Sequence, residues 1–193
     1  MSLETYADAR PWARAIKEEV LARRMPKWHA ARGFGDFAND PSLSPFEIAL
    51  IVAWVDGGAP RAPAASAGAP AFSGVVSPTH DPSAEGALER AREITVSCNN
   101  PPRVSGRLLA VRPVLARGGS LGILARHATG AQDVVAWIRN FEPEFTETYV
   151  LRHPIDLKPT SRLVATTSGT CELTIWIDEP SSRRSRQAPA LPH

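Results

Sequence analysis

The sequence is poor in cysteine and in net charge, and each shortage excludes a class of protein. Its 193 residues include two cysteines, Cys98 and Cys171, which are too few for a four-thiolate zinc site. They either form one disulfide in an oxidising compartment or stay as two buried thiols. The formal net charge is +2, so composition gives no indication of nucleic-acid binding.

Membrane-spanning and targeting signals are also missing. The longest apolar run, residues 48–55, is far shorter than the roughly 20 residues that a spanning helix needs. The first residues, Met-Ser-Leu-Glu-Thr-Tyr, contain no basic n-region, so no signal peptide is visible in this chain. We therefore expect the chain to have no transmembrane segment of its own.

Two amphipathic helices are expected in the first third of the chain. The first covers residues 8–24 and ends at Met25-Pro26, because a residue before proline is disfavoured in the helical region. The second covers residues 44–55 and begins with the capping box Ser44-Pro45-Phe46-Glu47. Their expected core consists of Trp12, Ile16, Val20, Ile48, Ile51, Val52 and Val55. From the segment between the helices, Phe34 and Phe37 are expected to fold back onto them.

The later part of the chain alternates between apolar and polar residues, as strands do. Seven short strands separated by turn residues favour an antiparallel, jelly-roll-like β-sandwich, so the predicted fold class is α+β in two domains. The strands are expected at 94–98, 106–114, 120–127, 133–139, 149–152, 162–167 and 172–177. The expected parts are a helical domain (1–58), a Pro/Ala linker (59–71), a β-sandwich domain (72–179) and a basic tail (180–193).

The first part of the chain also matches a known pattern of residues in order. The matching segments are Tyr6-Ala7-Asp8-Ala9-Arg10-Pro11-Trp12, Ile16-Lys17, Met25-Pro26-Lys27-Trp28-His29, Asn39-Asp40, Leu43-Ser44 and the run 51–60. Over residues 3–60 the chain resembles the latter part of a bacterial cytochrome c domain, of the kind fused to copper monooxygenase-like domains. The resemblance implies a small helical fold in which Met25 is the axial haem ligand. In that family a Cys-x-x-Cys-His segment precedes these matches, and this chain contains no such segment.

A second resemblance covers the β part. Its segments are Trp137-Ile138-Arg139, Tyr149, Pro154-Ile155-Asp156-Leu157, Arg162-Leu163 and Thr170-Cys171-Glu172-Leu173. They are similar to the C-terminal β-sandwich of copper type II, ascorbate-dependent monooxygenases. Those enzymes hold one copper through a His-x-His pair and a Met. This chain has no His-x-His pair, and its methionines are Met1 and Met25, so we expect no metal site.

No catalytic arrangement is apparent in the sequence, and we expect the protein not to be an enzyme. His80, His127 and His153 are spaced too irregularly to suggest a shared metal. No Gly-x-Ser-x-Gly segment offers a nucleophile. We interpret Met25 as a core residue and as a relic of haem ligation. Met25 would act as a haem ligand only if the protein carried haem. His29 beside it is expected to be a surface or hydrogen-bonded residue.

Both parts thus resemble redox modules without their redox ligands. The expected function is that of a non-catalytic accessory subunit, structural or docking, in an electron-transfer assembly at the periplasmic face of a membrane. Its expected partners are protein subunits including a cytochrome, and a photosynthetic reaction-centre complex with a bound cytochrome would fit. We expect no cofactor and no nucleic-acid partner. The expected interaction residues are Trp28, Arg183, Arg184 and Arg186.

Two alternatives remain open from the sequence. In the first, the chain is a c-type cytochrome electron carrier with haem c, whose haem motif lies upstream of a mis-assigned start. In the second, it is a copper monooxygenase-like enzyme that uses the β part.

Overall fold

The computed structural model describes residues 3–61, 82–101, 103–167 and 169–179 of the chain. Short helices precede a body of antiparallel strands in two sheets, in agreement with the coarse α+β prediction. The chain divides into two compact units, Met1–His29 with Ala38–His80, and Ala30–Phe37 with Asp81–His193. We call them the helical unit and the strand unit. The predicted tail, and all but the first residues of the predicted linker, lie outside the described residues.

The helical unit begins with an interrupted helix in place of the continuous one that we predicted. Helix α1 (Tyr6–Ala9) passes through a 3-10 turn (Arg10–Trp12) into α2 (Ala13–Leu21). Pro11 lies in that turn, and its missing N–H prevents a regular helical hydrogen bond there. None of the described helices is long and apolar enough to cross a membrane.

Helix α3 (Pro45–Asp56) begins with the predicted capping box. The Ser44 hydroxyl accepts a hydrogen bond from the Glu47 N–H at 3.2 Å, and the Ser44 N–H donates to the Glu47 carboxylate at 2.7 Å. Two backbone donors that would otherwise lack partners at the helix start are satisfied in this way. The capping box therefore fixes where this helix starts.

The core of the helical unit is smaller than predicted. Helices α2 and α3 contact each other, and Val20 and Ile48 are buried between them. Trp12 is 49% exposed, so its prediction as a core residue was wrong. Two short helices can shield only one side of each other, which leaves four other predicted core residues half-buried: Ile16, Ile51, Val52 and Val55.

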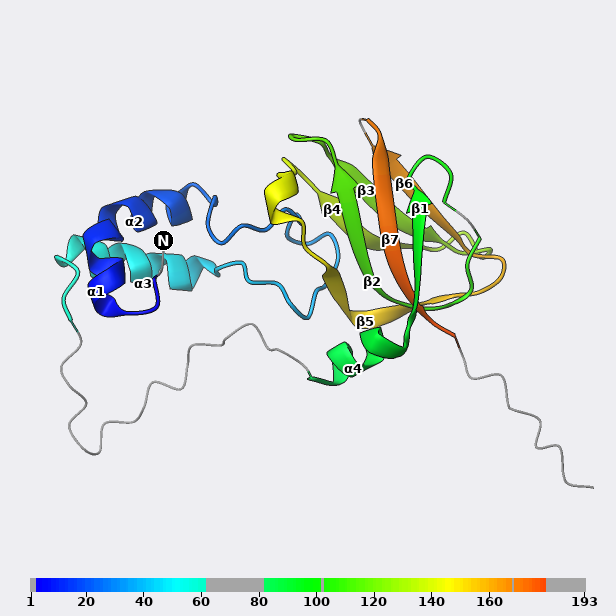
Figure 1. Cartoon of the computed structure of the whole chain (residues 1–193), viewed down its shortest axis with the longest axis horizontal. Coiled ribbons are helices and arrows are strands. Elements are labelled where there is room, and N and C mark those ends of the chain that lie inside the picture. Colours follow the sequence, from blue (N-terminus) through cyan, green and yellow to red (C-terminus); the bar gives the residue numbers. More distant parts are fainter. Residues whose placement is uncertain (1–2, 62–81, 102, 168, 180–193) are drawn as a thin grey trace, which may run out of the picture. The chain divides into compact units, whose positions relative to one another are not determined.

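The strand unit confirms all seven predicted strands. They are β1 (Arg92–Ser97), β2 (Gly106–Leu115), β3 (Leu121–Arg126), β4 (Gln132–Ile138), β5 (Tyr149–Leu157), β6 (Arg162–Thr167) and β7 (Cys171–Asp178). One sheet has the order β1-β7-β2-β5 and the other the order β4-β3-β6, and every pairing is antiparallel. Figure 1 shows the three-stranded sheet behind the four-stranded one.

Alternation along the strands fills the space between the sheets. On β3, the side chains of Leu121, Ile123 and Ala125 are fully buried, as is Ile175 on β7. Successive residues of a strand point to opposite faces of its sheet. The other residues of β3, beginning with Gly122, therefore face away from the core.

A helix that the sequence did not predict covers part of the outer face of the four-stranded sheet. Helix α4 (Pro82–Arg90) packs Ala87 and Leu88 against Leu109 and Trp176. Figure 1 shows the helix near the lower end of β5. We assigned no regular element to this segment from the sequence alone. The helix forms because its apolar side packs on the apolar surface of the sheet, and this removes both surfaces from water.

Part of the segment between the two predicted helices packs against the strands. Our prediction that Phe34 and Phe37 fold back onto the helices was therefore wrong. Phe34 packs edge-to-face on Trp137 with the ring centres 4.8 Å apart. Phe37 lies 5.4 Å from the Tyr149 ring and forms an isolated bridge with Leu151. Bridges of this kind occupy backbone groups that edge strands leave unpaired. The backbone of the β5 edge therefore pairs with Phe37, which we had expected to lie on the helices.

We predict that the side chains packed between the two sheets provide most of the stability of the strand unit. Replacing buried Ile175 by alanine (Ile175→Ala) removes packed methyl groups and should lower the free energy of unfolding by about 2–5 kcal/mol. The control Val114→Ala removes an exposed apolar side chain on β2 and should change it by about 0.5 kcal/mol or less. Urea unfolding of the two variants measures the difference. Equal losses would place the core elsewhere.

Candidate functional site

The residues proposed for haem ligation and docking lie just after α2. Met25 and Trp28 are half-buried, and His29 is buried. Before them, Arg24 donates two hydrogen bonds to the Glu19 carboxylate at 2.9 and 2.7 Å, which lowers the pKa of Glu19. The roles of Met25 as a relic ligand and of Trp28 in docking stay predictions. The other proposed interaction residues, Arg183, Arg184 and Arg186, lie outside the described residues.

Several residues of the helical unit have clear folding roles. The Tyr6 hydroxyl donates to the Ala59 carbonyl at 2.9 Å, and the Trp54 indole N–H donates to the Pro60 carbonyl at 3.0 Å. The Arg61 guanidinium lies 5.8 Å from the centre of the Tyr6 ring. These contacts hold the chain leaving α3 against α1. They therefore help to close the helical unit.

The two cysteines are joined in a disulfide, which answers the question left open by the sequence. Cys98 follows β1 and Cys171 begins β7, and their Cα atoms are 5.4 Å apart, a separation typical of disulfides. The Cys98 N–H also donates to the Cys171 carbonyl at 3.0 Å. Such bonds persist mainly in oxidising compartments.

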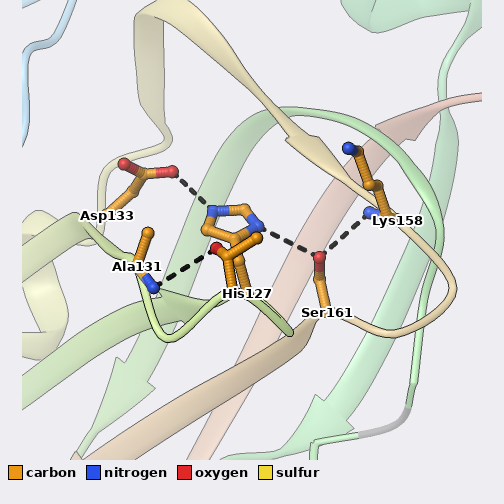
Figure 2. A network of polar contacts seen from close by, with 6 residues as sticks. His127, Ala131, Asp133, Lys158 and Ser161 are labelled. Atoms are coloured by element: carbon orange, nitrogen blue, oxygen red, sulfur yellow. Dashed lines mark hydrogen bonds and ion pairs between the residues drawn. The ribbon is translucent and has the colours of Figure 1, made fainter.

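A chain of polar contacts that the sequence did not reveal surrounds His127 (Figure 2). Its Nε2 lies 2.8 Å from the Asp133 carboxylate and its Nδ1 lies 3.1 Å from the Ser161 hydroxyl. The Lys158 N–H donates to the same hydroxyl oxygen at 3.1 Å. Residue separations of 6 and 34 hid this arrangement from sequence reasoning. It uses the residue types of a serine hydrolase triad.

Burial decides against catalysis at this hydroxyl. In the neutral tautomer that fits both contacts, His127 donates from Nε2 to Asp133 and accepts the Ser161 proton at Nδ1. A nucleophile must also reach the substrate. Ser161 is 1% exposed, and its oxygen already accepts the Lys158 N–H. The network instead ties the turn between β3 and β4 to the turn between β5 and β6.

A hollow on the outer face of the three-stranded sheet is a better candidate site. It has a volume of about 460 Å³, and aromatic rings of Phe34 and Trp137 line one side. Gly122 lies opposite Trp137 on β4 and Thr166 on β6. A Cβ atom built on Gly122 would meet nothing within 4 Å. The missing side chain of this glycine therefore leaves room beside Trp137.

The lining of this hollow suits binding more than chemistry. Apolar side chains dominate it, with Leu124 and Val134 beside the aromatic pair, and Thr166 and Thr167 add hydroxyl groups. Trp137 itself remains 40% exposed. Pockets that bind small ligands are mostly apolar with a few polar groups, as here. The resemblance had singled out Trp137 as a motif residue, but no sequence signal indicated the hollow.

The predicted absence of a metal site stays a prediction. Within the described residues, no group of three His, Cys, Asp or Glu side chains is placed to hold a metal ion. His153 is exposed and lies 3.8 Å from Asp36, apart from the His127 network, and His80 lies outside the described residues. Comparison with protein-family models gives no match, and searches of curated proteins and of solved structures give none either.

We predict that Ser161 contributes stability. Ser161→Ala removes the hydroxyl that accepts the Lys158 N–H and contacts His127 Nδ1, and both contacts are partly buried. At about 0.5–1.5 kcal/mol for each hydrogen bond, the free energy of unfolding should fall by about 1–3 kcal/mol. The control Ser105→Ala, at an exposed position, should have little effect. Chemical denaturation of both variants measures this. Equal stability of the two variants would remove the structural role assigned to the network.

We also predict that the disulfide stabilises the strand unit. It joins residues 73 positions apart, and closing a loop of that length typically stabilises a domain by about 2–5 kcal/mol. A variant with alanine at both Cys98 and Cys171 should melt at a lower temperature than the oxidised chain. Intact mass under non-reducing conditions should show two hydrogens fewer than the reduced chain. A melting temperature unaffected by reduction would contradict the prediction.

Proposed function

We propose that the chain is a non-catalytic docking subunit of an electron-transfer assembly at the periplasmic face of a membrane. Its partners would be protein subunits that include a cytochrome, and a photosynthetic reaction-centre complex is one assembly of that kind. The helical unit supplies the docking surface in this proposal. The strand unit, a jelly-roll-like sandwich in this proposal, supports it.

The apolar exterior of the helical unit is the observation that carries the proposal. Four large apolar side chains in a small unit are about half exposed or more: Trp12 (49%), Leu21 (53%), Phe46 (71%) and Leu50 (50%). Phe46 and Leu50 are four residues apart on α3 and so lie on one face of the helix. Adjacent large apolar side chains exposed on one helix face are a candidate protein interface. A partner that covers α3 would complete the small core.

The resemblance to cytochrome c domains suggests which partner that is. Helical surfaces of such domains dock on other redox proteins, and this chain retains the helices without a haem-attachment segment. The disulfide between Cys98 and Cys171 supports an extracytoplasmic location. The proposed domains, 1–58 and 72–179, remain part of this interpretation.

The arrangement of reactive groups favours docking over catalysis. Ser161, the hydroxyl closest to a histidine–carboxylate pair, is enclosed. Met25 is half-buried after α2, consistent with a core residue. The alternative of a copper enzyme would need copper ligands in the β part, where no His-x-His pair occurs.

We predict that the docking depends on α3. In membranes from cells that make the chain, the solubilised protein should co-elute with a haem-containing complex on size-exclusion chromatography. The double variant Phe46→Asp/Leu50→Asp should elute alone, because charge at an apolar interface opposes burial. Its melting temperature should change little, since both side chains are exposed. Haem absorbance and immunoblotting of the fractions give the readout.

The control is Ala128→Asp, which adds charge at an exposed turn of the strand unit and should leave co-elution unchanged. Elution of the unmodified chain apart from any haem-containing complex would overturn the proposal. A sharp haem band carried by the purified chain itself would favour the alternative of a c-type electron carrier.

A further inference from the structure

The two sheets of the strand unit differ in how their outer faces are covered. Helix α4 covers part of the four-stranded sheet, where Leu88 packs against Leu109 and Trp176. On the three-stranded sheet, Phe34 packs on Trp137, and the adjoining hollow of about 460 Å³ is open. A face with exposed aromatic and aliphatic side chains beside an open hollow is a candidate for ligand binding.

Apolar residues extend from this hollow along the sheet. Leu124 on β3 lies opposite Val134 on β4 and Val164 on β6. Leu124 and Val134 line the hollow, and Val134 is 42% exposed. Because alternate residues of a strand share a face, this row lies next to the row of Trp137 and Gly122. The apolar surface thus covers two successive rows of the sheet.

The next row along the same face is basic. Arg126 on β3 lies directly opposite Arg162 on β6, and both side chains are exposed. No ion pair joins either arginine to a residue that the structure describes. Like charges directly opposite each other on neighbouring strands are destabilising. Two guanidinium groups at this spacing would both be stabilised by one bound carboxylate.

A second hollow adds to the positive charge at this end. Arg162 and Val164 line it together with Arg103, and its volume is about 430 Å³. Asn99 and Asn100 contribute amide groups to the same lining. The side of β6 near Arg162 therefore offers several donors to an anion, whereas the side near Thr166 offers an apolar space.

From these observations we propose that the outer face of the three-stranded sheet binds an amphiphilic carboxylate. The apolar body of the ligand lies over Gly122 against Trp137, and its carboxylate accepts hydrogen bonds from Arg126 and Arg162. This site belongs to the strand unit and does not depend on the docking function proposed for the helical unit.

The spacing of the rows sets the size of the ligand. Gly122 and Arg126 are four residues apart on one strand, a distance of about 13 Å at roughly 3.3 Å per residue. An extended acyl chain of about ten carbons has that reach. Decanoate is therefore a suitable probe, and decan-1-ol is its uncharged counterpart.

Isothermal titration calorimetry of the full chain with monomeric decanoate tests the site. Decanoate should bind with one site per chain, and decan-1-ol should bind about tenfold or more weakly, because it lacks the charge-assisted hydrogen bonds. Butyrate, which has the carboxylate but a short body, should show no measurable binding. Equal affinities for decanoate and decan-1-ol would overturn the role of the arginines.

Gly122→Val separates binding from folding. Valine is favoured in strands, and the space at this Cβ is open, so the variant should melt at the same temperature or higher. Its side chain would fill the space beside Trp137, and decanoate binding should be lost. Unchanged decanoate binding by this folded variant would place the ligand elsewhere and overturn the proposal.

Two charge variants locate the carboxylate. The double variant Arg126→Gln/Arg162→Gln should bind decanoate no better than decan-1-ol. Arg107→Gln, which removes an exposed arginine from the other sheet, should bind as the unmodified chain does. A third arginine, Arg139, has its guanidinium 5.0 Å from the centre of the Trp137 ring. If Arg139→Gln abolished the preference for decanoate while the double variant kept it, the proposed position of the carboxylate would be wrong.

A vesicle-binding experiment distinguishes a free carboxylate ligand from a membrane lipid as the molecule that occupies the site. Vesicles of phosphatidylglycerol also present acyl chains with anionic headgroups. In a sedimentation assay, the unmodified chain and Gly122→Val should associate with these vesicles to the same extent. Association that is lost in Gly122→Val, together with no binding of decanoate, would overturn the assignment of a free carboxylate.

Discussion

Strand β3 lies in the middle of the three-stranded sheet, and burial of one of its faces governs much of the strand unit. Leu121 and Ile123 must point inward to fill the core, so Gly122 and Leu124 must point outward. Shifting the register by one residue would exchange the two sets and empty the core. The hollow beside Trp137 is therefore a consequence of the packing that stabilises the sheets.

The second requirement on the strand unit is that the backbone groups at the edges of its sheets find hydrogen-bond partners. Strand β4 is an edge strand, and the Ala31 N–H donates to the Trp137 carbonyl at 2.7 Å. Near the β5 edge, the Arg152 N–H donates to the Asp36 carbonyl at 2.9 Å. Backbone groups left open at an edge attract other chains, and here a segment of the same chain binds them. These hydrogen bonds explain why residues 30–37 belong to the strand unit.

The His127 network shows why a constellation of residue types does not define an activity. Ser161, His127 and Asp133 have the contacts of a catalytic triad, yet the hydroxyl is enclosed and already accepts a backbone hydrogen bond. Accessible surface is found elsewhere, on α3 and beside Trp137. The two proposals, docking by the helical unit and ligand binding by the strand unit, follow from those surfaces and can fail independently.

The sequence by itself determined the elements whose signals are local. Alternation placed all seven strands, and the capping box at Ser44 placed the start of α3, because both depend on residues close together in the chain. Only the tertiary structure decided the order of the strands, the contact between His127 and Ser161, the exposure of Trp12 and the destination of Phe34. Each of these depends on which distant surface is left to be covered, and a local pattern carries no information about that surface.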